Sequence, residues 1–378
     1  MKNVLKILCI TLIITISGCK SQKTRTLLFV GSYTEGVPNE GIFVYNFNTD
    51  SGELQLAYTE NNIVNPSFLK LSPNGNYLYS VTESQLQTNG NVSAFAVNAN
   101  SGKLTFLNKQ DAGGRNPVHL AMHASGKFLV NANYTDPSIS VFPIAIDGSL
   151  SPYSQILTFK DSSIVKGRQD EAHIHSTNFS PDGNYLFAQD LGADKIRGFS
   201  THENTTDFLK MVVDLKMKPG SGPRHFTFHP NGKYGYSVAE LSGKITAYAY
   251  NEGQLKFIAD YLSYSKIQDI YRTADVHISP DGTYLYASNR GPEEDSISIF
   301  SINTLNGELS LVAHEPTYGE HPRNFTLDPT GNFLLVANQF SGNIVVFKRD
   351  VNTGKLTKLS QELKIKNPSS LQMFSYKN

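Results

Sequence analysis

The stretch Ser221-Gly-Pro-Arg-His-Phe-Thr-Phe-His-Pro-Asn-Gly-Lys-Tyr-Gly-Tyr-Ser-Val-Ala-Glu240 decides the fold of this chain. Both of its halves alternate in the manner of half-buried strands, and Pro-Asn-Gly between them is a turn sequence. Proline presets φ at the first turn position, and glycine accepts positive φ at the end of the turn. The stretch therefore predicts a β-hairpin with two charged residues, Arg224 and Glu240, at its outer ends.

The same hairpin outline occurs six times along the chain. The six turns are Ser72-Pro-Asn-Gly75, His123-Ala-Ser-Gly126, Ser180-Pro-Asp-Gly183, His229-Pro-Asn-Gly232, Ser279-Pro-Asp-Gly282 and Asp328-Pro-Thr-Gly331. Their glycines are separated by 51, 57, 49, 50 and 49 residues. A regular period of this length is typical of an array of like structural units.

Each unit contains more than its hairpin. A third alternating segment follows, such as Lys244–Tyr250, and a glycine turn then leads into a fourth. Four antiparallel strands per unit describe a blade of a β-propeller. Thr26–Tyr33 matches a second strand without a first, and Asn367–Phe374 matches a first strand without a second. We therefore predict an all-β, seven-bladed propeller over residues 26–378, closed by a blade that the two termini share.

Composition limits the classes of function. The chain has 378 residues, with 33 Lys and Arg against 33 Asp and Glu, and this balance favours no nucleic-acid partner. Its two cysteines, Cys9 and Cys19, both lie near the N-terminus. The remainder of the chain therefore has neither a disulfide framework, nor a thiolate metal site, nor a cysteine nucleophile.

The first residues are typical of a targeting segment. A basic start and the short apolar run Ile7–Ile16 precede a small-residue pair and Cys19, which resembles a bacterial lipobox. This pattern predicts a signal peptide over 1–18, lipidation of Cys19 and a tether over 19–25. The alternative is an ordinary signal peptide or short anchor with an incidental cysteine. We expect an exported lipoprotein of the periplasm or cell envelope, in contact with a membrane only through this anchor.

The units differ most at the two ends of their hairpins. Six residues before the turn proline stand Ser67, Val118, His175, Arg224, Ala274 and Arg323. Ten residues after it stand Glu83, Tyr134, Leu191, Glu240, Arg290 and Gln339, with Asp190 one place earlier. Both positions lie at the same end of a blade, near the central channel. Units three to six therefore predict one arc of the channel mouth that is dense in ionisable groups: His175, Asp190, Arg224, Glu240, Arg290 and Arg323.

Such an arc suits an active site. An imidazole and a carboxylate exchange protons near neutral pH, and guanidinium groups stabilise a developing oxyanion or hold an anion. The structural alternative is that Arg224 and Glu240 form a salt bridge at the blade end. His173 and His175 share one strand face, which is compatible with a metal, but no third ligand stands in register and we assign no metal site.

Four strings carry a family resemblance: GPRHFTFHPNGKYGYSVAEL, HIHSTNFSPDGNYLFAQDLGADKI, TADVHISPDGTYLYASNRG and HPRNFTLDPTGNFLLVANQ. Together they resemble the lactonase family of seven-bladed propellers. That family includes the propeller type of 6-phosphogluconolactonase and is related to the carboxy-muconate lactonizing enzyme. The resemblance runs from about Thr26 to Phe374.

The resemblance implies a catalytic set of one histidine, two arginines and one glutamate. By their motifs these match His175, Arg224, Glu240 and Arg290. His175 is preferred over His173 because of its register and the serine that follows it. No cofactor is implied.

We therefore expect the hydrolysis of a sugar-acid lactone at the channel mouth, as in a 6-phosphogluconolactonase. Water would attack the ester carbonyl with Glu240 or His175 as general base, while Arg224 and Arg290 stabilise the oxyanion. The candidates for substrate binding are Arg323, Asp190 and His225. The expected partner is a small lactone, and the expected state is a monomer.

Two other functions stay open. The same groups could close a lactone ring from an unsaturated dicarboxylate, or the propeller could bind carbohydrate or protein at the cell surface without chemistry. A mouth filled with paired, buried side chains would favour the binding module. Export also leaves open whether the lactone is phosphorylated, because phosphorylated sugars are expected to be scarce outside the cytoplasm.

Overall fold

The computed structural model describes residues 24–34, 41–61, 63–83, 87–203 and 207–377. The predicted signal peptide and the lipidation site Cys19 lie outside these residues. Within the described ranges, no helix has both the length and the apolar character that crossing a bilayer requires.

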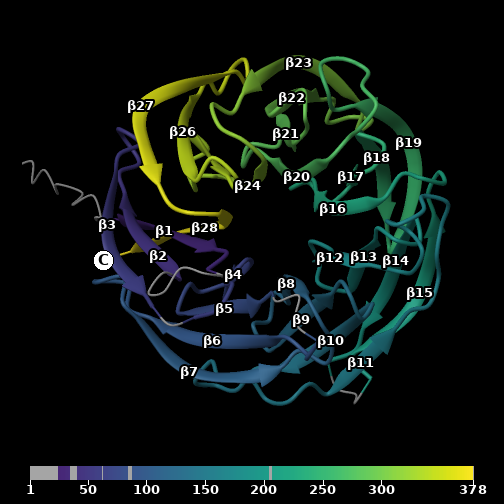
Figure 1. Ribbon diagram of the computed structural model, residues 1–378, viewed down its shortest axis with the longest axis horizontal. Helices are drawn as coiled ribbons and strands as arrows, with labels where there is room; N and C mark the ends of the chain where they lie inside the picture. The colour runs from purple at the N-terminus through teal and green to yellow at the C-terminus, as the bar shows by residue number, and fades with distance from the viewer. Residues whose placement is uncertain (1–23, 35–40, 62, 84–86, 204–206, 378) are drawn as a thin grey trace, which may run out of the picture.

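Seven four-stranded antiparallel sheets stand around a central channel, as Figure 1 shows. The strands that border the channel are β4 (Leu69–Leu71), β8 (Pro117–Met122), β12 (Ile174–Phe179), β16 (Pro223–Phe228), β20 (Thr273–Ile278), β24 (Pro322–Leu327) and β28 (Pro368–Lys377). The predicted seven-bladed, all-β propeller is confirmed.

The other strands follow outward in the same order of blades. The second strands are β5 (Tyr77–Thr82), β9 (Phe128–Asn133), β13 (Tyr185–Asp190), β17 (Tyr234–Ala239), β21 (Tyr284–Asn289), β25 (Phe333–Asn338) and β1 (Thr24–Ser32). The third strands are β6 (Asn91–Val97), β10 (Ser138–Pro143), β14 (Lys195–Thr201), β18 (Lys244–Asn251), β22 (Ser296–Ile302), β26 (Asn343–Arg349) and β2 (Ile42–Phe47). The outermost strands are β7 (Leu104–Asp111), β11 (Gln155–Thr158), β15 (Leu209–Lys216), β19 (Gln254–Leu262), β23 (Leu309–Pro316), β27 (Leu356–Lys364) and β3 (Leu54–Glu60).

The termini share the closing blade, as the sequence predicts. β28 supplies its innermost strand and pairs with β1 along its length, from Thr24 opposite Lys377 to Ser32 opposite Pro368. β1 begins two residues before the predicted Thr26, inside the expected tether, because Thr24 and its neighbour also find ladder partners on β28. Pairing the two ends of the chain in one sheet closes the ring.

The core lies between blades rather than inside any one of them. One apolar cluster, for example, joins Val130 and Ile139 of one blade to Leu186 and Phe199 of the next. The hairpin turns behave as their sequences predict: Gly232 has φ +71°, a conformation that glycine adopts without steric cost. Packing of this kind holds each blade end at a fixed place on the channel.

Most of the innermost strands carry a β-bulge close to the point where they begin. The register of β16 shifts between Pro223 and His225, and β12 shifts in the same way between Ile174 and Ser176. A bulge re-aims side chains relative to the regular alternation of a strand. As a result, the successive residues Arg224 and His225 both line one cavity in the channel.

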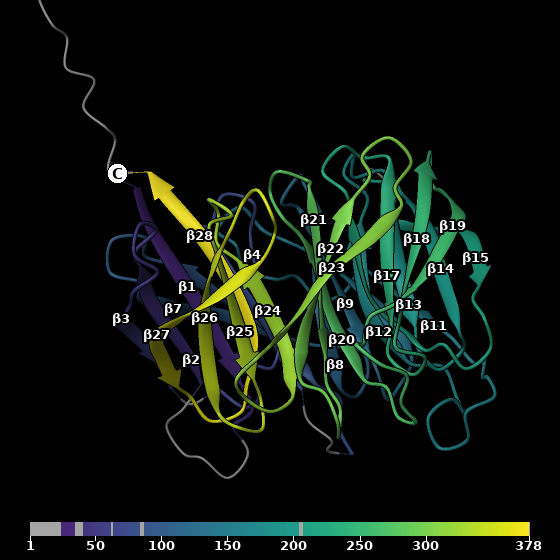
Figure 2. The same cartoon turned by 90° about the horizontal axis from the view of Figure 1, so that it is seen from above.

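The channel has two distinct ends. The innermost strands run through the thickness of the ring, which Figure 2 shows from the side. Six of them end at the six hairpin turns, and β28 ends at the same side, where Tyr376 Oη donates to the carbonyl of Gly75 in the first turn. We call this end the turn mouth. The innermost strands begin at the opposite end, which we call the arginine mouth after Arg224, Arg290 and Arg323.

Candidate active site

Glu240 is the centre of an ion cluster at the arginine mouth. It directly follows β17, and its Oε2 accepts from Arg224 Nε at 2.9 Å and from Arg290 Nη2 at 3.0 Å. Arg224 belongs to the same blade and Arg290 to the next one. All three side chains are at least 90% buried. The predicted pairing of Arg224 with Glu240 therefore exists, and it is part of a larger network.

A third guanidinium reaches Glu240 from a loop. Arg168 Nη2 donates to Glu240 Oε1 at 2.5 Å, and its side chain is 40% exposed. Arg168 lies in the segment 160–172 that lengthens the gap between units two and three. Repeat superposition missed Arg168 because no other unit has a position equivalent to this insertion. The sequence feature that could have indicated Arg168 is a positively charged residue in an inserted segment that directly precedes the unit of His175.

The contacts within the cluster shift the pKa values of Glu240 and Arg224. Burial alone raises the pKa of Glu240, but the guanidiniums of Arg290, Arg224 and Arg168 outweigh burial and hold that pKa well below its ordinary value. Burial, with the neighbouring Arg290, lowers the pKa of Arg224 to about 9. At neutral pH Glu240 is thus a carboxylate and Arg224 a cation.

His175 lies beside this cluster, at a cavity of about 10 Å³. The cavity is lined by Ser67, Phe68, Val118, His175, Arg224, His225, Arg323, Asn324 and Ser369. His175 Nδ1 is buried without a hydrogen-bond partner in the described part of the chain. Burial, then the charge of Arg224, lowers the pKa of His175 well below its ordinary value, so the ring is neutral. A cavity of this size is close to the minimum for one water molecule.

Arg323 enters the same cavity from another blade. Its guanidinium is 5.4 Å from the ring centre of Tyr33 and 3.6 Å from Glu83 Oε1. Glu83 also accepts from Tyr33 Oη at 2.7 Å and from Ser67 Oγ. The ionisable groups therefore extend beyond the predicted arc, because the closing and first blades add the phenol of Tyr33 and the carboxylate of Glu83 beside Arg323.

Two of the predicted substrate-binding residues have partners inside the fold. Asp190 is fully buried and accepts from Arg197 Nη2 at 2.7 Å, within its own blade, as well as from the backbone N–H of His173. The structure therefore does not bring Asp190 to the cluster. His225 does line the cavity, with its Nδ1 2.7 Å from Asp275 Oδ1.

His173 and His175, which the sequence places on one strand face, have different surroundings: His173 directly precedes β12 and His175 lies on it. The ring of His173 stacks on Tyr134 at 4.2 Å, and its Nδ1 donates to the Tyr134 carbonyl at 2.9 Å, whereas His175 faces the cavity. Across the residues that the structure describes, no group of three or more His, Cys, Asp or Glu side chains is arranged to hold a metal ion.

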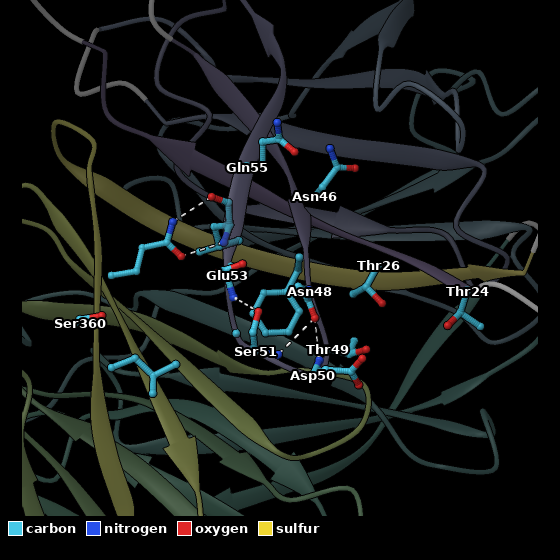
Figure 3. Close-up of a pocket in the computed structure, with 15 residues that line it drawn as sticks. Thr24, Thr26, Asn46, Asn48, Thr49, Asp50, Ser51, Glu53, Gln55 and Ser360 are labelled. Carbon is cyan, nitrogen blue, oxygen red and sulfur yellow. Dashed lines mark hydrogen bonds between the residues drawn. The ribbon is translucent and has the colours of Figure 1, made fainter.

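Another cavity lies away from this cluster. It measures about 820 Å³ and is formed by β1, β2, β3, β27 and the turn 48–53, in the closing blade (Figure 3). Some of its polar groups bond within the fold: Asn48 Oδ1 accepts from the N–H groups of Asp50 and Ser51, and Gln361 bonds both backbone groups of Leu54. The residues that line this cavity include none of the predicted site residues.

The fold and the mouth together define a propeller with a buried histidine, glutamate and arginine centre. Residues 27–373 match the family described as "Lactonase, 7-bladed beta-propeller", and the chain belongs to this family. It is 61% identical to a 6-phosphogluconolactonase of Formosa agariphila, over 92% of this chain and 99% of that protein. It is 35% identical to a 6-phosphogluconolactonase of Bacillus subtilis, over 91% of this chain and 97% of that protein.

Solved structures agree with this assignment. A putative 6-phosphogluconolactonase from Bacteroides fragilis superposes with a TM-score of 0.87 at 38% identity, covering 93% of this chain and 98% of that one. A periplasmic gluconolactonase from Pseudomonas aeruginosa superposes with a TM-score of 0.87 at 33% identity, covering 93% and 99%. The expected family resemblance is confirmed.

Proposed function

We propose that this protein is a lactonase that hydrolyses a sugar-acid lactone to the open acid, with the arginine mouth as its active site. The Formosa and Bacillus relatives, named 6-phosphogluconolactonases and matched over almost their whole length, support the reaction class. The geometry of the mouth supports the location. Hydrolysis, rather than ring closure or passive binding, is the function that both lines of support favour.

One observation carries the location of the site. His175 Nδ1 has no partner among the described residues, and in the same part of the chain neither Arg224 Nη2 nor the Arg323 guanidinium donates a hydrogen bond. All three side chains line the one water-sized cavity. Paired and buried groups alone would favour a binding module, but these three keep nitrogen atoms available for a reactant.

The geometry favours His175 over Glu240 as the general base. Both oxygens of Glu240 accept hydrogen bonds from guanidiniums, so Glu240 anchors the cluster, whereas His175 Nδ1 has no partner among the described residues. His175 is neutral, and it can take a proton from a water molecule held in the cavity as that water attacks the lactone carbonyl. Arg224 then faces the oxyanion that develops.

Arg290 and Arg323 take different roles. All three nitrogens of Arg290 are engaged, with the Arg272 carbonyl, His321 Nε2 and Glu240, so Arg290 holds the cluster in place. Among the described residues, the one ionic partner of Arg323 is Glu83 at 3.6 Å, so its guanidinium can bind an acidic or hydroxyl group of the substrate. No residue of this scheme needs a cofactor for hydrolysis.

A plain aldonolactone is the second candidate substrate beside a phosphorylated one. The Pseudomonas structure, a periplasmic gluconolactonase, favours it.

We also propose that the chain is an exported lipoprotein anchored at Cys19. Lys20 to Lys23 separate that cysteine from Thr24, which lies at the turn-mouth end of β1. The arginine mouth would then open away from the membrane.

A substrate screen tests the proposal. Purified protein is offered 6-phosphogluconolactone and gluconolactone, and acid release is titrated against spontaneous hydrolysis. We expect enzymatic release from at least one lactone, and its loss in Arg224→Ala and His175→Gln, while the exposed Lys103→Met leaves it intact. Incubation with an unsaturated dicarboxylate separates ring closure from ring opening. Equal acid release from Arg224→Ala and the parent would show that the site is wrong.

A further inference from the structure

The channel holds a second cavity, at the turn mouth. It measures about 290 Å³, at the small end of the range of about 300 to 1,000 Å³ for ligand cavities. Phe68, His225 and Asn324 line this cavity as well as the water-sized one, so they form the partition between the two. The turn-mouth cavity is therefore a separate compartment, reached from the opposite end of the channel.

A lysine without a partner lines this compartment. Lys70 is the middle residue of β4, and in the part of the chain that the structure describes its ammonium makes neither a hydrogen bond nor an ion pair. Burial lowers the pKa of Lys70, as is expected for a cation that lacks a counter-charge. Surface lysines usually extend into water, whereas Lys70 stands on the channel wall and bears a cost that a bound anion would relieve.

Two further donors accompany Lys70. The backbone N–H of Thr177 donates to His119 Nδ1 at 3.3 Å, so the neutral ring carries its proton on Nε2. Among the described residues that Nε2 has no partner. Thr177 lines the same cavity, and its buried hydroxyl has no hydrogen-bond partner in the described part of the chain. Buried polar groups are normally satisfied, so unpaired donors on one cavity point to a missing acceptor.

The nearby acid does not supply that acceptor. Asp275 is bonded to His225 Nδ1 at 2.7 Å and to His277 Nε2 at 3.0 Å, and it also accepts from the Asn324 amide and two backbone N–H groups. Its side chain is 4% exposed. Asp275 lines the turn-mouth cavity too, but its oxygens are taken up by these donors, and among the described residues it makes no ion pair with Lys70.

We propose that the turn mouth binds a small anion, of the carboxylate or phosphate type, through Lys70 Nζ, His119 Nε2–H and the Thr177 hydroxyl. The site is distinct from the proposed active site and does not depend on the lactonase function. Charge-assisted hydrogen bonds from Lys70 supply most of the affinity, and the histidine and threonine orient the anion.

Calorimetric titration of the purified full-length protein tests this site. Inorganic phosphate and gluconate are the probes, and glucose is the neutral control. We expect both anions to bind and glucose to release no heat. Lys70→Met should weaken anion binding by about tenfold or more, the typical effect of losing a charge-assisted hydrogen bond. This variant replaces an unpaired cation by an apolar chain of similar length, so it is expected to fold.

Two control variants test whether the anion binds at Lys70 rather than at another part of the protein. Lys103→Met removes an exposed lysine from the same blade and should bind as the parent does. Arg323→Gln changes the arginine mouth and should also leave this binding event unchanged. Absence of anion binding in the parent, or affinity that falls in Arg323→Gln but not in Lys70→Met, overturns the proposal.

Crystals soaked in selenate give an independent position through the anomalous scattering of selenium. We expect selenium within hydrogen-bond reach of Lys70 Nζ. Selenate found only at the arginine mouth also overturns the proposal.

Discussion

Two neighbouring blades each contain a carboxylate bonded to arginine, but in one blade this contact lies within the sheet and in the other it lies at the channel. In the blade of β12 to β15, Asp190 ends the second strand and binds Arg197 on the third strand of its own sheet. In the blade of β16 to β19, Glu240 stands one position further along and binds Arg224 and Arg290 at the channel. A one-residue step reverses the face of a strand on which a side chain lies.

The Asp190–Arg197 pair stabilises its own blade, whereas the contacts of Glu240 hold arginine side chains in place at the proposed active site. The charges of Asp190 and Arg197 connect strands of one sheet, and their loss would weaken that blade. The contacts of Glu240 join three segments of different blades and hold two guanidiniums beside His175. Identical carboxylate–guanidinium chemistry therefore has different consequences, which mutation can distinguish.

The largest expected effect is on folding. Asp190→Ala removes the fully buried partner of Arg197, leaves it with the partly exposed Asp161 and Asp214, and removes the acceptor for the His173 N–H. We expect the free energy of unfolding to fall by about 3 kcal/mol or more, the usual cost of breaking a buried ion pair. Urea unfolding followed by circular dichroism measures it, and kcat/KM of the folded fraction should stay at the parental value.

Asp214→Ala is the matched control. Asp214 also contacts Arg197, at 3.4 Å, but its side chain is 41% exposed. Its removal should cost less than about 1 kcal/mol, as for surface ion pairs. If Asp190→Ala lowers kcat/KM without lowering stability, Asp190 belongs to the active site after all.

The next effect is on catalysis. Glu240→Gln keeps the shape of the side chain but removes the charge that holds Arg224 and Arg290 close together. We expect kcat/KM for the cleaved lactone to fall on the order of 100-fold, comparable to losing an oxyanion-stabilising group. Near-parental kcat/KM in a folded Glu240→Gln protein would remove this residue from the mechanism.

The fold could be predicted from the sequence because its structural unit, the four-stranded blade, is repeated along the chain. Six turn strings at a period near fifty fix the blades, and the partial units at the two termini fix the closure. Superposition on the turns also brings Arg224, Glu240 and Arg290 together, since their backbone positions are set by the repeat. The same method placed Asp190 with them, because a spacing of one residue cannot show which face a bulged or ending strand presents.

Features outside the repeat could not be found in this way. Arg168 belongs to an insertion, and its contact with Glu240 depends on how a loop folds back over the mouth. The contribution of Tyr33 depends on the closing blade lying beside the first one, where the Tyr33 hydroxyl donates to Glu83. Lys70 occupies a channel position at which the other units carry different residues, so only the cavity reveals that it has no partner.

A smaller catalytic effect is expected at Arg168. Its side chain is partly exposed, and without it Glu240 keeps two guanidinium partners. Arg168→Gln should therefore lower kcat/KM only about tenfold, equivalent to about 1.4 kcal/mol of transition-state stabilisation. Steady-state kinetics measures it, with the exposed loop variant Lys166→Gln as control. A loss as large as that in Glu240→Gln would place Arg168 in direct contact with the substrate.

The smallest expected effect is on the pH dependence of the free energy of unfolding, through His225. Burial, then the charge of Arg224, lowers the pKa of His225 to about 4, whereas an exposed histidine titrates near 6.5. Between these values the unfolded chain binds a proton that the folded chain does not, so the free energy of unfolding falls as the pH drops. His225→Asn should remove about 1 kcal/mol of this fall between about pH 6 and 5.

Urea unfolding at both pH values, compared between parent and variant, isolates this contribution. The comparison is needed because burial lowers the pKa of His119, His175 and His321 too, and all of them act in the same direction. If His225→Asn keeps the parental pH dependence, His225 is already protonated in the folded protein, and Asp275 then holds a cation in the partition between the two mouths.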